Sequence, residues 1–149
     1  MKYFSVFVLI LLISCSFQTK SQKVNVGFED IYHHYFTLTP EKYVIIDSQE
    51  KMNEISSSIR KNYRGNRSPP IPQVTAEEKY IVFKPVLKNT NDVEIDKVEV
   101  LNQTLYIKTK PAENPDRSRS SRFSPNILIK IYTAQILKKV IINTQKQIE

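Results

Sequence analysis

The chain has 149 residues and a formal net charge of +7, long enough for one domain with its own hydrophobic core. Its two glycines cannot build a glycine-rich phosphate loop, and its single cysteine cannot form an internal disulfide. The only histidines, His33 and His34, are adjacent, and neighbouring residues on a strand point to opposite faces. We therefore expect surface or packing residues there, and no metal, cofactor or catalytic histidine.

Residues 1–14 are typical of a secretory signal peptide, with a basic start, an apolar run and Ser14 before the cut site. The apolar run is shorter than the roughly 20 residues that span a bilayer. The stretch Leu12-Ile13-Ser14-Cys15 resembles the bacterial lipobox, in which the cysteine is lipidated and becomes the first mature residue. The alternative is an ordinary signal peptide with a cysteine near the cut. The lipobox predicts an envelope lipoprotein anchored at Cys15, in the outer membrane if the cell has two membranes.

Residues 15–40 are expected to form a lipid-attached tether and an N-terminal segment ahead of the domain. The stretch 16–23 is almost entirely polar, as in a flexible tether. The stretch 24–38 contains enough apolar residues to dock on the domain, but its pattern leaves open whether it forms a strand.

The first clear elements are a strand and a helix. The run Tyr43-Val44-Ile45-Ile46 predicts a strand, and Asp47 or Ser48 can cap a helix that follows. Apolar residues at offsets of three and four then predict a helix over 49–62 that packs through one stripe. That stripe consists of Met52, Ile55 and Ile59.

A proline-rich loop over 67–72 leads to a strand over 79–84. The alternation of apolar residues over 93–100 then slips by one position, which predicts a β-bulge near Asp96-Lys97. A tight turn over 101–104 joins this strand to the next one, over 105–109. Acidic residues on one strand would face lysines on the other, so we interpret these charges as a solvated face rather than as catalytic carboxylates.

Residues 110–125 predict a polar, arginine-rich loop, and loops of about 15 residues in a small domain are usually functional or disordered. Strands over 126–132 and 139–142 follow, and residues 144–149 are a frayed tail. Together these elements predict an α+β domain over 41–143, an antiparallel sheet of five or six strands with one packed helix.

This order of elements resembles the C-terminal domain of the PrcB family. The resemblance rests on Val44-Ile45-Ile46-Asp47-Ser48 with its helix, the strand 80–85, the meander to 106–108, and the proline-bearing loop 110–125 before 127–131. The glycine-rich turn usual before the third strand is replaced here by Lys88-Asn89-Thr90-Asn91-Asp92. The resemblance implies a non-enzymatic lipoprotein that binds and stabilises a secreted subtilisin-like serine protease.

Exposed aromatic residues and arginines commonly form the centre of a protein interface. All six arginines lie in two short stretches, 60–67 around the end of the helix and 117–122 in the 110–125 loop. The candidate partner-binding residues are Arg64, Arg117, Arg119, Arg122 and Phe123. The alternative for these residues is a solubilising loop with incidental charge.

Two other classes of function stay open. A basic module could hold a polyanion or the anionic envelope surface, and its binding would weaken steeply with salt. An enzyme would need a site built from carboxylates such as Asp47 and Glu50 without help from histidine or cysteine. We expect a protein partner and the membrane, reached through lipid on Cys15, and no nucleic-acid partner.

Overall fold

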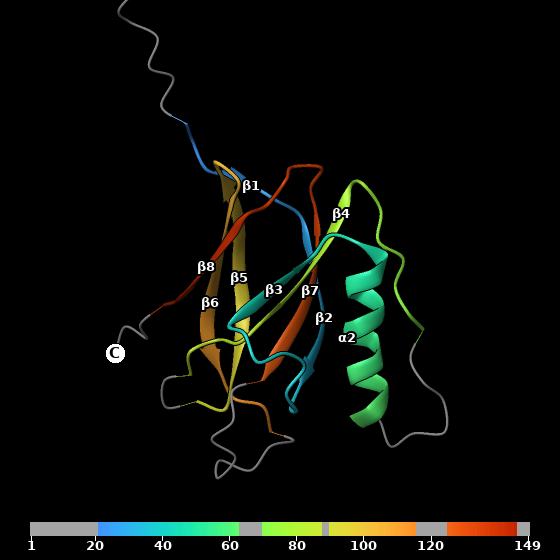
Figure 1. Ribbon diagram of the computed structural model, residues 1–149. Coiled ribbons are helices and arrows are strands. Elements are labelled where there is room, and N and C mark those ends of the chain that lie inside the picture. The colour runs from blue at the N-terminus through green and yellow to red at the C-terminus, as the bar shows by residue number, and fades with distance from the viewer. Residues whose placement is uncertain (1–20, 63–69, 88–89, 116–124, 146–149) are drawn as a thin grey trace, which may run out of the picture.

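The computed structural model describes residues 21–62, 70–87, 90–115 and 125–145. In these ranges two four-stranded sheets pack face to face, and one helix covers the outer face of one of these sheets (Figure 1). The α+β class is confirmed. The described strands number eight and divide into two sheets, whereas the sequence predicted five or six strands in one sheet.

Sheet A has the order β1-β5-β6-β8 and sheet B the order β2-β7-β4-β3. Neighbouring strands are antiparallel except β6 and β8, which are parallel. The strands of sheet A are β1 (Val24–Asn25), β5 (Asp92–Leu101), β6 (Thr104–Ala112) and β8 (Lys139–Thr144). Those of sheet B are β2 (Phe28–His34), β3 (Tyr43–Ile46), β4 (Glu78–Phe83) and β7 (Asn126–Tyr132), and the helix is α2 (Gln49–Asn62).

The fold extends N-terminal of the boundary expected at residue 41. Residues 24–34 supply a strand to each sheet, since β1 pairs with β5 and β2 pairs with β7. Phe28 packs against the core between the sheets. The sequence did not indicate β2 as a strand because residues 29–32 are all exposed and show no alternation of apolar and polar side chains.

The two central strands of sheet B contribute to two separate cores. Along β4, Ile81 and Phe83 face sheet A, whereas Tyr80 and Val82 face α2. Strand β7 repeats the arrangement, with Leu128 on the helix side. Its residues Ile127, Ile129 and Ile131 lie on the side of sheet A and are all fully buried. Such strands are apolar on both faces, which explains the continuous apolar runs in the sequence.

Helix α2 has the predicted bounds and the predicted packing stripe. Ser48 caps it, because the Ser48 hydroxyl accepts a hydrogen bond from the backbone N–H of Lys51 at 3.4 Å. The stripe is completed by a polar residue, Ser56, which is buried with its three apolar members.

The β5–β6 hairpin also agrees with the sequence. The register shifts between Ile95 and Lys97, where the bulge was predicted. In the turn, Asn102 and Gln103 have φ angles of 48° and 62°, the left-handed pair that matches the twist of a two-residue hairpin. Ion pairs cross from β6 to β5 as expected, from Lys108 to Glu99 and from Lys110 to Asp96.

The buried stripe of α2 gives the first prediction. Ile55 is 7 % exposed, so Ile55→Asp would bury an unpaired charge and should cost about 4 kcal/mol or more. The matched control, Ser57→Asp, lies on the exposed face of the same helix and should shift stability by about 0.5 kcal/mol. Urea unfolding followed by circular dichroism measures both. Equal midpoints for the two variants would contradict the packing of α2.

Candidate functional site

The residues that the sequence proposed for lipid attachment and partner binding lie outside the described residues. They are Cys15, Arg64, Arg117, Arg119, Arg122 and Phe123. The structure does describe the residues that flank the arginine-rich stretch 116–124 on either side. The candidate site therefore consists of these flanks and the surfaces next to them.

The C-terminal flank of the stretch is fixed by Asn126, which is 3 % exposed. Its amide oxygen accepts the backbone N–H of Leu38 at 3.2 Å, and its amide nitrogen donates to the backbone carbonyl of Phe36 at 3.0 Å. One side chain thus connects the start of β7 to the segment that follows β2.

The N-terminal flank is fixed by a reciprocal pair of hydrogen bonds between Asn114 and Asn91. The backbone N–H of Asn114 donates to the Asn91 side chain at 2.7 Å, and the Asn91 side chain donates to the Asn114 carbonyl at 2.9 Å. The Asn114 side chain also donates to Tyr35 Oη and to Asp92 Oδ2. Both flanks of the 116–124 stretch are therefore held by buried or half-buried asparagines.

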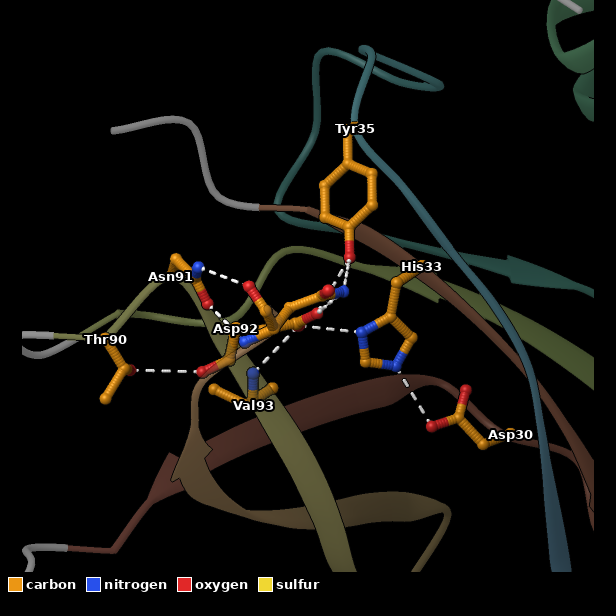
Figure 2. Close-up of polar contacts among 8 residues, drawn as sticks. Asp30, His33, Tyr35, Thr90, Asn91, Asp92 and Val93 are labelled. Carbon is orange, nitrogen blue, oxygen red and sulfur yellow. Dashed lines mark hydrogen bonds and ion pairs between the residues drawn. The ribbon is translucent and has the colours of Figure 1, made fainter. Parts of the chain in front are cut away.

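Asp92 connects this flank to a charged network between the sheets (Figure 2). Its Oδ1 lies 2.7 Å from His33 Nδ1, and its Oδ2 accepts a hydrogen bond from Tyr35 Oη at 2.9 Å. The other ring nitrogen of His33, Nε2, lies 3.0 Å from Asp30 Oδ2. Since His33 lies on β2 and Asp92 on β5, this ion pair joins the edge of sheet B to sheet A.

Both partners of the ion pair are charged at neutral pH. Burial opposes charge on His33, but hydrogen bonds to Asp30 and Asp92 outweigh it and raise its pKa to about 9. Burial would raise the pKa of Asp92, but hydrogen bonds from His33 and from the backbone N–H of Val93 hold it below the usual value. Both ring nitrogens of His33 are engaged by carboxylates, so in this arrangement neither nitrogen can accept a substrate proton or ligate a metal.

His34 points to the opposite face and belongs to a packed aromatic row. Its ring lies 4.6 Å from the ring of Tyr32 and 5.2 Å from that of Phe36, measured between centroids. Burial lowers the pKa of His34, and the nearby charge of His33 adds to this effect, so that the pKa is about 4. The His34 ring is therefore neutral at neutral pH. The packing role expected for His34 is confirmed, whereas the ion pair of His33 was not foreseen.

A cavity of about 320 Å³ lies between β2 and α2, beside this aromatic row. Two of its lining residues are exposed to a large degree, Ile31 at 40 % and Tyr32 at 58 %. Met52 and Ser56 of α2 form the opposite wall. The remaining lining residues are His34, Phe36, Ile59, Pro70, Pro72 and Leu128. The cavity is therefore mostly apolar and opens beside the edge strand.

The two carboxylates considered for an enzyme, Asp47 and Glu50, lie at the start of α2. Asp47 lies 2.8 Å from Lys51 one helical turn away, and this hydrogen bond lowers the Asp47 pKa. Glu50 is exposed in the first turn of α2. Among the described residues, no group of three or more histidine, cysteine, aspartate or glutamate side chains could hold a metal ion.

Comparisons with known proteins gave no match to a family model, to a curated protein or to a solved structure. Within the residues that the structure describes, no helix has the length and apolar character needed to cross a membrane.

The His33 network predicts how stability depends on pH. Because the folded pKa of about 9 exceeds the ordinary value of 6.5, His33 stabilises the fold below pH 6.5, and this contribution is lost as the pH rises to about 9. His33→Gln should lower stability at neutral pH and remove this alkaline decline. The control His34→Gln should keep the decline. Urea unfolding across this pH range measures it, and an unchanged decline in His33→Gln would contradict the charged pair.

Proposed function

We propose that the chain is a non-enzymatic envelope lipoprotein that binds a protein partner and stabilises it as an accessory subunit. The proposed partner is a secreted subtilisin-like serine protease, as the resemblance to the PrcB family implies. The order β3, α2, β4, β5, β6 and β7 follows the order of elements on which that resemblance rests. The proposed anchor is lipid on Cys15, which would hold the domain at a membrane outside the cytoplasm.

The observation that carries the binding role is the fixation of both flanks of the arginine-rich stretch. Asn91 and Asn114 hold one flank, and Asn126 holds the other. Fixing the ends of a binding segment lowers the conformational entropy that is lost when a partner binds. The network that fixes the first flank uses both ring nitrogens of His33, which supports a structural role rather than catalysis.

The charge-driven alternative receives less support from the described surface. On the outer face of the β5–β6 hairpin, Lys97, Lys108 and Lys110 are each paired with an acidic residue. Paired lysines leave little net positive charge to attract a polyanion. This alternative would have to rest on charges elsewhere, such as the six arginines and the exposed lysines Lys42, Lys61 and Lys138.

The test compares two triple variants of the full chain. Arg117→Ala, Arg119→Ala and Arg122→Ala together should lower the recovery of a protein partner from envelope extract several-fold. The melting temperature should stay nearly unchanged, because surface substitutions usually cost less than about 0.5 kcal/mol. The matched control removes the same charge elsewhere on the exposed surface, at Lys42, Lys61 and Lys138, and should keep partner recovery.

Two outcomes of this experiment would count against the proposal. Equal recovery by both triple variants would exclude the arginines from the interface. Loss of wild-type recovery at moderate salt, with retention of polyanions only, would favour the charge-driven module.

The same preparations report on the anchor. Intact mass of protein from the membrane fraction should show loss of residues 1–14 and addition of a diacylglyceryl group at Cys15. Cys15→Ser should leave the chain outside the membrane fraction. An unmodified chain that begins at another residue would refute lipid attachment but not partner binding.

A further inference from the structure

Strand β2 forms one edge of sheet B and has a single strand neighbour, β7, among the described residues. An edge strand presents a row of backbone N–H and C=O groups that can pair with another chain. At seven residues, β2 is longer than β3, the strand at the opposite edge of sheet B. Its residues 29–32 are exposed, including the large apolar side chains of Ile31 and Tyr32.

The apolar cavity lies on the face of sheet B that α2 covers, next to this edge. Tyr32 and His34 line it from β2, and Met52 and Ser56 line it from α2. Side chains of directly paired residues on adjacent strands lie about 5 Å apart. A strand added to β2 would therefore place side chains of alternate residues beside Tyr32 and His34, where they can enter the cavity.

Charge around β2 differs in sign from the charge of the whole chain. Strand β2 carries two exposed acidic residues, Glu29 and Asp30. Its one cationic group, His33, is shared between Asp30 and the buried Asp92 of β5. The edge is thus locally acidic in a chain whose net charge is +7. A partner segment with basic residues would complement it.

The same features disfavour a second copy of this chain as the occupant. Charged side chains on an edge strand hinder indiscriminate strand pairing, and β2 carries Glu29 and Asp30. Two copies of β2 would also bring two acidic edges together. A different chain with basic residues avoids this repulsion.

We propose that the outer edge of β2 binds an extended, basic segment of a protein partner as an additional strand of sheet B, with one aliphatic side chain in the cavity between β2 and α2. Main-chain hydrogen bonds to β2 supply affinity, and the cavity and the acidic edge supply specificity. This inference rests on the proposed function, because it specifies how a protein partner is recognised.

The test uses a fluorescent peptide, Lys-Thr-Thr-Leu-Thr-Thr-Lys, with both ends capped. Its seven residues match the length of β2. Fluorescence anisotropy with the full chain should show binding that weakens at least tenfold when the central leucine becomes alanine, because burial of the leucine side chain is lost. Methylation of alternate backbone nitrogens should abolish binding, because it removes the donors to β2. Glutamate in place of both lysines should weaken binding.

Nuclear magnetic resonance locates the bound peptide. The largest amide shift changes should fall on residues 29–33, and those of the edge strands β3 and β8 should stay small. Equal binding of the methylated peptide, or shift changes centred on another edge, would overturn the proposal. Neither measurement needs a variant protein.

A cavity-filling variant tests the pocket separately. Ser56 is 5 % exposed and lines the cavity, so Ser56→Leu should occupy it without lowering the melting temperature. The variant should bind the leucine peptide no more tightly than the alanine peptide. The control Ser57→Leu, on the exposed face of α2, should retain the leucine preference. A large drop in melting temperature for Ser56→Leu alone would show that the cavity is too small for a leucine side chain and would overturn this part.

Failure of this inference is distinguishable from failure of the proposed function. If no peptide binds but a partner is still recovered from envelope extract, the β2 proposal is wrong and the accessory role stands. If the peptide binds at β2 but no envelope protein is recovered, the accessory role is wrong and strand addition stands.

Discussion

The central strands of sheet B, β4 and β7, are buried on both faces, and most of the fold follows from that constraint. Strands β4 and β7 alternate side chains between the core shared with sheet A and the core shared with α2. A polar side chain at almost any position of these strands would be desolvated without a partner. The exception occurs near the end of the pair, where Lys130 lies 2.8 Å from Glu78 and both remain partly exposed.

The position of α2 explains why β2 is partly uncovered on the helix side of sheet B. The helix packs on residues of β3, β4 and β7, namely Ile46, Tyr80, Val82 and Leu128. Its stripe is narrow, and the small side chain of Ser56 lines the cavity opposite β2. The helix therefore leaves β2 partly uncovered, with a cavity in between. The edge is secured from the other side by the ion pair of His33 with Asp92 of sheet A.

Local elements were predictable from the sequence because they depend on residues close together in the chain. The stripe Met52, Ile55 and Ile59 specified α2, and the slip in alternation specified the bulge between Ile95 and Lys97. The division into two sheets was not predictable in the same way. It depends on long-range pairing, such as the parallel pairing of β6 with β8 across an intervening strand of the other sheet. Whether residues 24–38 contain a strand was also left open, because residues 29–32 of β2 are all exposed and show no alternation of apolar and polar side chains.

The candidate site was less predictable than the fold. His33 and Asp92 are 59 residues apart, and no local pattern marks them as partners. The asparagines that fix the 116–124 stretch are common residue types in loops, so Asn91 and Asn126 gave no signal before their contacts were known. The sequence did indicate the stretch itself, through its arginines and its length.

Amide hydrogen exchange resolved by residue tests the central role of sheet B most directly. If both of its faces are core, the amides of residues 80–83 in β4 and 127–131 in β7 should exchange last, and only through global unfolding. The amides of β1 and of the outer residues of β2 should exchange far earlier. Slower exchange in the β5–β6 hairpin than in β4 and β7 would contradict the account, because sheet A would then be the stable unit on which sheet B docks.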